Sequence, residues 1–195
     1  MIEAVRQLLH SLLGVRACKK AGGNSRRQPP ENEAVRAYNS ARRRYLSELL
    51  EQRLSKKTRV MACGLSFEAH FDPEKQAVWT SSLGAEPYLP TDVFVVVCEL
   101  LSGEGVARLG DAMKGALGDP ALPLDSVEGA VAEQVFGRQP GERVYRRVGA
   151  ITALMVHLGM ARLDADAGVL ETTGAGVYVG SGKPIERLEM LHSSA

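Results

Sequence analysis

The stretch GAGVYVGSGKP, residues 174–184, has the composition of a loop that binds phosphate. A P-loop has the pattern G-x-x-x-x-G-K-[ST], in which glycine backbone groups cradle the phosphates and the final hydroxyl holds Mg²⁺. Here Val177 stands where the first glycine is needed, and Pro184 stands where the hydroxyl is needed. The spacing therefore argues against a P-loop, and we interpret the stretch as part of a flexible tail or short terminal helix over residues 176–195.

The cysteines and histidines show no spacing that would hold a metal ion. They are Cys18, Cys63, Cys98, His10, His70, His157 and His192. No nucleophile elbow, Ser/His/Asp order or paired-carboxylate motif is recognisable either. We therefore predict a protein that is not an enzyme and has no metal or cofactor. Its cysteines are expected to be buried free thiols in a reducing compartment.

Positive charge is concentrated in the first third of the chain. Residues 1–59 hold 14 Lys or Arg against 5 Asp or Glu, whereas residues 60–195 hold 10 against 18. The balance is +9 in the first part and −8 in the second. A basic arm is attracted to nucleic acid or to an acidic protein partner. Within the arm, Arg42, Arg43 and Arg44 are the candidate phosphate contacts; the alternative is a solvated helix with surplus arginine.

Composition places the chain among globular proteins. It has 195 residues, of which 45% are hydrophobic and 24% charged, so a packed core should form. No apolar run reaches the roughly 18 residues that a membrane-spanning helix needs, so we expect no membrane partner. The predicted location is the cytoplasm or the nucleoid. A mitochondrial or other organellar matrix is the alternative, because the arginine-rich N-terminus also fits a transit peptide.

Hydrophobic periodicity predicts two helices and a β-hairpin in the first half of the chain. The helices are expected at residues 2–13 and 31–56, and the second would bury Ala34, Tyr38, Ala41, Tyr45 and Leu49. Residues 58–71 alternate in polarity, which predicts one long strand. Its buried face would comprise Met61, Cys63, Leu65, Phe67, Ala69 and Phe71. A turn at Asp72–Lys75 and a second strand at 76–83 complete the hairpin.

Helices dominate the prediction from residue 90 onward. For LPTDVFVVVCELL we favour a helix over a buried strand, with Thr91 or Asp92 as its N-cap. A second helix is predicted at residues 103–118. A third is expected to start at Asp125 with Glu128 completing a capping box, and to stop at Gly137. The last helix, residues 141–159, would end at Gly159 in a left-handed conformation.

The last two helices are followed by MARL, a DADAG turn and VLETT, which is the order of a helix-turn-helix with a β-hairpin wing. The segment RVYRRVGAITALMVHLGMARLDADAGVLETTGAG resembles the recognition-helix-to-wing segment of winged-helix proteins, a resemblance that covers about residues 125–174 and points to no specific family. It implies an α+β, mainly α protein. The predicted parts are a basic helical arm at 1–58, a β-hairpin at 59–90 and a winged-helix-like domain at 91–175.

The resemblance also implies a mode of DNA binding. Winged helices often lay the second helix of the pair in the major groove, with residues at its beginning reaching base edges and the wing touching the backbone. In this sequence those places belong to Arg143, Arg146 and Arg147 on the helix and to Arg162 on the wing. Against this mode, Asp164 and Asp166 at the wing tip would face phosphate.

Two functional hypotheses follow. The first is a nucleic-acid-binding protein, with DNA ranked above RNA, in which the winged helix supplies the fold and the basic arm adds phosphate contacts. The second is a structural subunit of a larger protein or ribonucleoprotein complex, because many winged helices are protein-assembly modules and fold alone does not decide function. Either role is compatible with a homodimer or a multi-subunit complex. The clustered arginines rank DNA binding first.

Overall fold

The computed structural model describes residues 33–173 of the chain. The chain divides into two compact units, residues 1–31 and 32–195, and the described residues belong to the second. The predicted helix at residues 2–13, the linker after it and the glycine-rich tail lie outside the described residues. The boundaries predicted at residues 58 and 90 both fall within the second unit.

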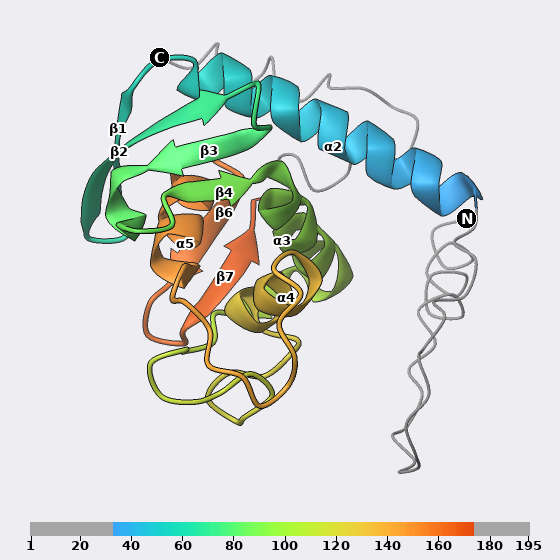
Figure 1. Cartoon of the computed structure of the whole chain (residues 1–195), viewed down its shortest axis with the longest axis vertical. Coiled ribbons are helices and arrows are strands. Elements are labelled where there is room, and N and C mark those ends of the chain that lie inside the picture. The colour runs from blue at the N-terminus through green and yellow to red at the C-terminus, as the bar shows by residue number, and fades with distance from the viewer. Residues whose placement is uncertain (1–32, 174–195) are drawn as a thin grey trace. The chain divides into compact units, whose positions relative to one another are not determined.

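Helices and two antiparallel sheets make up the described residues, which confirms the α+β class (Figure 1). One sheet has the strand order β1-β2-β3-β4, and the other has the order β5-β7-β6. The elements are α2 (Glu33–Leu54), β1 (Thr58–Ala62), β2 (Leu65–Asp72), β3 (Ala77–Thr80), a 3-10 turn (Ser81–Leu83), β4 (Tyr88–Pro90), α3 (Thr91–Glu104), β5 (Val106–Arg108), α4 (Val127–Gln134), α5 (Val148–His157), β6 (Ala161–Asp164) and β7 (Val169–Thr172). One hydrophobic core extends through α2, both sheets and the other helices.

Helix α2 forms where it was predicted, and its buried face agrees with the prediction in part. The fully buried side chains are Arg42, Leu46, Leu50 and Leu54. Tyr45 and Leu49 of the predicted stripe are half-buried against the core, whereas Ala41 is exposed, and the side chains of Ala34 and Tyr38 lie outside what the structure describes. Arg42 is only 1% exposed and lies 3.7 Å from Glu99 on α3, to which it is ion-paired. Because a charged side chain occupies a core position, the true apolar stripe is interrupted in the sequence and a neighbouring stripe looks more regular.

The long strand predicted at residues 58–71 is two strands joined by a tight turn. Cys63 and Gly64 have φ angles of 55° and 71°, as a two-residue hairpin turn requires, and Ala62 pairs with Leu65. The two-residue turn shifts the buried positions by one residue, so Val60 rather than Met61 faces the core from β1, opposite Phe67. Of the predicted buried face, Phe67, Ala69 and Phe71 are buried. Met61, Cys63 and Leu65, predicted to be buried, are exposed.

Two further hairpins are closed by longer turns, each of which follows an aspartate. The Asp72 carboxylate accepts hydrogen bonds from the backbone N–H groups of Glu74 and Lys75, and Asp164 accepts them from Asp166 and Ala167. An aspartate that bonds the backbone two and three residues ahead stabilises a turn without any tertiary contact. Both turns were predicted from sequence, and the pairing of β2 with β3 and of β6 with β7 confirms them.

The helix predicted after residue 90 exists as α3, with Pro90 rather than Thr91 or Asp92 as its N-cap, but the helix predicted at 103–118 does not exist. Gly105 has a φ of 79° and ends α3 in a left-handed conformation, and its N–H group donates to Leu101. Residues 106–108 then form β5, which pairs with β7. The remainder of this segment consists of turns that pack around Leu117 and Leu122. The helical spacing of apolar residues in this segment is therefore coincidental. Gly105, Gly110 and Gly118 have positive φ angles, which interrupt a helix.

Helices α4 and α5 are closed by side chains and glycines. Ser126, rather than the predicted Asp125, is the N-cap of α4, and its hydroxyl accepts a hydrogen bond from Gly129. At the end of α5, Gly159 has a φ of 71°, with Gly159 N–H donating to Val156 and Met160 N–H donating to Met155. This is the Schellman arrangement, so the predicted left-handed stop at Gly159 is confirmed.

Gly129 offers a sharp test of packing around α4. A Cβ atom at this position would lie 2.0 Å from the carbonyl oxygen of Pro123, which is backbone and cannot move aside cheaply. Gly129→Ala should therefore lower the free energy of unfolding by about 1–3 kcal/mol. The matched control is Gly103→Ala on α3, where a Cβ meets nothing within 4 Å and stability should rise by up to about 1 kcal/mol. Equal effects in chemical denaturation would contradict the described geometry.

Candidate functional site

The three arginines predicted at the start of the last helix lie in the segment that precedes it. Helix α5 begins at Val148, so Arg143 and Arg146 belong to a connection over residues 135–147, and Arg147 is the residue that flanks the helix. The prediction of a short turn followed by a helix from residue 141 was wrong. Arg143 and Arg146 are exposed, whereas Arg147 is buried.

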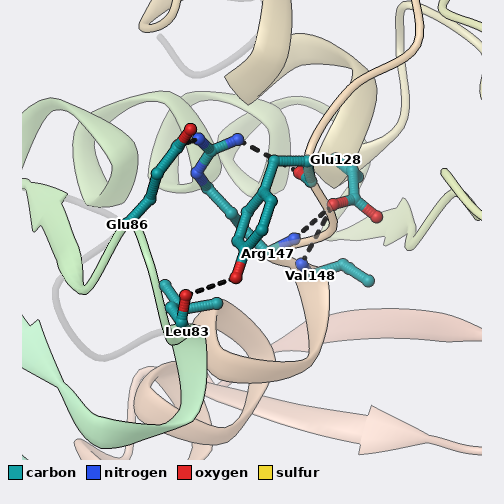
Figure 2. Close-up of polar contacts among 6 residues, drawn as sticks. Leu83, Glu86, Glu128, Arg147 and Val148 are labelled. Carbon is teal, nitrogen blue, oxygen red and sulfur yellow. Dashed lines mark hydrogen bonds and ion pairs between the residues drawn. The ribbon is translucent and has the colours of Figure 1, made fainter.

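Arg147 is a buried anchor that connects the beginning of α5 with the loop before β4. Its side chain is 5% exposed, forms an ion pair with Glu86 from the loop before β4, and donates to the carbonyl oxygen of Tyr145 at 3.1 Å (Figure 2). Its guanidinium also lies 3.9 Å from the centre of the Phe136 ring. The Tyr145 hydroxyl donates in turn to the Leu83 carbonyl. Because these contacts occupy the guanidinium, Arg147 is not available to reach a base edge.

Glu128 fixes the beginning of α5 from the neighbouring helix α4. Its Oε1 accepts hydrogen bonds from the backbone N–H groups of Arg147 and Val148, the second at 3.3 Å (Figure 2). An acidic group at a helix N-terminus satisfies N–H groups that have no partner within the helix. Burial of the carboxylate outweighs these hydrogen bonds and raises the pKa of Glu128 above its ordinary value of 4.5. The predicted capping residue therefore caps the following helix instead of its own.

The other predicted phosphate contacts are distributed over separate surfaces. Arg162 lies directly opposite Glu171 in the β6–β7 hairpin and donates to its carboxylate at 3.0 Å. Arg42 is buried against α3, and Arg43 is hydrogen-bonded to Asp92 at 2.6 Å. Arg44 is exposed on α2. The structure therefore does not bring the seven arginines of the prediction into one site.

Helix α5 is enclosed by the rest of the protein. Seven of its ten residues are buried, and it packs against β1, β6 and α3. Leu65, at the start of β2, approaches the position of a Gly149 Cβ to 3.4 Å. The first hairpin therefore lies against a helix whose beginning was predicted to contact DNA.

A groove of about 400 Å³ lies beside the beginning of α5. Its apolar walls come from Leu65, Leu83, Leu109, Val148 and Leu163. Arg146 is the charged residue of its lining, and Thr152 contributes a hydroxyl. The Thr152 side chain is 3% exposed, and its Oγ1 has no hydrogen-bond partner within residues 33–173. Sequence reasoning missed this groove because its walls come from five separate parts of the chain.

The described cysteines differ from each other in environment. Cys98 lies in the core, and burial raises the pKa of its thiol to about 12, so it is protonated and unreactive at neutral pH. Cys63 is exposed at the hairpin turn, which corrects the prediction that it is buried. Cys18 lies outside the described residues. Within the described part of the chain, no group of three His, Cys, Asp or Glu side chains could hold a metal ion.

A comparison of the chain with protein families, with curated proteins and with solved structures found no match. Among the described residues, no helix combines the length and the apolar character needed to cross a membrane.

Arg147 and Arg146 are neighbours with opposite expected roles. Arg147→Ala should lower the free energy of unfolding by at least about 2 kcal/mol, because the buried side chain loses its packing on Phe136 together with its ion pair. Arg146→Ala removes an exposed side chain and should change stability by no more than about 0.5 kcal/mol. Chemical denaturation of both variants measures the difference. A fully stable Arg147→Ala variant would show that the anchor does not hold the fold.

The raised pKa of Glu128 predicts a pH dependence of stability with a definite sign. Between 4.5 and the folded-state pKa, the native protein binds more protons at this group than the unfolded chain does, so the free energy of unfolding falls as pH rises. Glu128→Gln keeps an acceptor oxygen but does not titrate. The stability of the wild type relative to this variant should therefore decline from pH 4.5 upward and then level off. A difference that grows with pH would contradict the assignment.

Proposed function

We propose that the protein is a non-enzymatic subunit of a larger protein or ribonucleoprotein complex, and that residues 91–173 form a winged-helix module that binds a protein partner. The order α3, β5, α4, α5, β6, β7 supports the module, because it contains a helix pair followed by a β-hairpin. The sheet order β5-β7-β6 adds a third strand to that hairpin. The connection between α4 and α5, residues 135–147, is longer than the turn of a typical helix-turn-helix.

The enclosure of α5 is the observation that carries this proposal. A helix that reads DNA must present side chains of one face to the base edges of the major groove. Here α5 offers half-buried Gly149 and Val156 and exposed His157, and β1 packs against it. The arginine nearest its start, Arg147, is held by Glu86. We therefore rank the assembly role above duplex reading, which stays a prediction.

The groove beside α5 favours an apolar segment of a partner protein that also carries a carboxylate. Leucine walls bury an aliphatic side chain, and Arg146 beside them matches an acidic group. The Thr152 hydroxyl lies buried beneath this lining and has no hydrogen-bond partner among the described residues. In the free protein this hydroxyl is a buried polar group without a partner, which costs about 1–3 kcal/mol.

Substitutions in the groove test this role. Leu65→Asp places a charge in the apolar wall and should abolish co-purification of native partners, whereas Met113→Asp should leave it unchanged because Met113 is 70% exposed and does not line the groove. A photo-crosslinking residue at position 65, but not at position 113, should capture the same partner. Arg146→Glu should weaken the interaction without destabilising the free protein.

Thr152→Val serves as a control for packing beneath the groove. The valine removes the buried unpaired hydroxyl at nearly constant volume, so the free protein should become more stable while partner binding stays unchanged. Wild-type protein and the Leu65→Asp variant are also titrated with duplex DNA at low salt. Sequence-specific duplex binding by the wild type, with partner capture insensitive to Leu65→Asp, would reject the assembly role in favour of DNA reading.

A further inference from the structure

Three aromatic side chains form a row across the four-stranded sheet. His70 on β2 pairs in register with Trp79 on β3, which pairs with Tyr88 on β4. The centres of the His70 and Trp79 rings are 5.1 Å apart, and all three residues are half-buried. We call His70, Trp79 and Tyr88 the aromatic row. Half-buried rings on adjacent strands offer flat apolar surface without belonging to the core.

The aromatic row lies on the opposite face of the sheet from the core and from the groove. Successive side chains of a strand point to opposite faces, so His70 is directed away from Phe67, Ala69 and Phe71. Those three residues are buried, and Leu65, which lines the groove, shares their parity along β2. A ligand on the aromatic row would therefore bind separately from the proposed protein partner.

Two lysine ammonium groups lie over rings of the aromatic row, so these flexible side chains must move aside before a base can stack on the covered faces. Lys57 Nζ lies 5.6 Å from the centre of the Trp79 ring, and Lys75 Nζ lies 3.9 Å from that of Tyr88. The acidic groups nearby, Glu68 and Asp72, are ion-paired with Lys57 and Lys75 at 3.8 and 3.5 Å. The charge of each lysine is therefore balanced by one carboxylate.

A surplus of positive charge remains where α2 leads into β1. Arg53, Lys56 and Arg59 are exposed there, within seven residues of chain that also contain Lys57. Arg59 donates a hydrogen bond to the Ser66 hydroxyl rather than to a carboxylate. Within the described residues, the predicted basic arm therefore ends in closely spaced cations, of which Lys57 contacts the aromatic row.

We propose that this face of the four-stranded sheet binds single-stranded nucleic acid, with unpaired bases stacked on the aromatic row and phosphates held by the cations of the α2–β1 segment and Lys75. Aromatic side chains that interleave with basic ones are the usual platform for such strands, because every base has a face to stack and every nucleotide a phosphate. A duplex keeps its bases stacked inside, so it can use the cations but not the rings. The inference goes beyond the proposed assembly role and does not depend on it.

Trp79 provides a direct signal for stacking, because it is the one tryptophan of the chain. The full-length protein is titrated with a ten-nucleotide oligo(U), oligo(dT) and a ten-base-pair duplex, while tryptophan fluorescence and the anisotropy of labelled strands are recorded. Both single strands should quench Trp79 on binding, and the duplex should not. The basic residues outside the described region attract any polyanion, so anisotropy alone does not decide between stacking and simple charge attraction.

Substitution of Tyr88 separates stacking from packing. Tyr88→Phe keeps the ring and should bind single strands nearly as the wild type does. Tyr88→Leu keeps apolar bulk without a π face and should bind roughly 5- to 150-fold more weakly. Thermal unfolding checks that both variants fold. Equal affinity of the Phe and Leu variants would overturn the stacking proposal.

Lysine substitutions test the phosphate contacts with a matched pair. Lys75 and Lys114 are each ion-paired with an aspartate three residues earlier, but only Lys75 borders the aromatic row. Lys75→Gln should reduce the slope of log affinity against log salt by about 0.7, and Lys114→Gln should leave it unchanged. The Leu65→Asp variant should bind oligonucleotides like the wild type, which separates this proposal from the protein-docking one. Duplex binding that matches single-strand binding, without quenching of Trp79, would refute the proposal.

Discussion

The fold depends on how the beginning of α5 is held. Glu128 on α4 receives the first N–H groups of the helix, and Arg147 extends from the same point to Glu86 near the four-stranded sheet. Tyr145 reaches the same loop through Leu83. A buried carboxylate and a buried guanidinium are costly unless each is hydrogen-bonded, so these groups leave few alternative positions for the helix. They join the four-stranded sheet to the helices and to the second sheet as one packed unit.

This constraint has a functional consequence. With its beginning tied to the loop before β4, α5 lies under the first hairpin and becomes part of the core rather than a surface helix. The same packing creates the groove, since Leu65, Val148 and Leu163 meet only because the β1–β2 hairpin, α5 and the β6–β7 hairpin converge. The geometry that disfavours the insertion of α5 into DNA thereby provides an apolar surface suited to a protein partner.

The two proposed surfaces would bind different ligands within one complex. The groove would hold an apolar, acidic segment of a partner, and the outer face of the four-stranded sheet would hold a single strand of nucleic acid. They lie on opposite sides of β2, because Leu65 and His70 have opposite parity along that strand. Occupation of one surface therefore leaves the other accessible, as a subunit of a ribonucleoprotein assembly would require.

The sequence alone predicted those turns and helix ends whose structure is determined by a single short stretch of chain. The turns after Asp72 and Asp164 and the stop at Gly159 were all predicted, because an aspartate or glycine acts on its own backbone. Tertiary structure decided the rest. It placed Arg42 in the core opposite Glu99, assigned Glu128 to cap another helix, and made Arg147 an anchor instead of a ligand contact. Such roles depend on partners many residues away, and a sequence specifies the charge of an arginine without specifying which distant carboxylate will neutralise it.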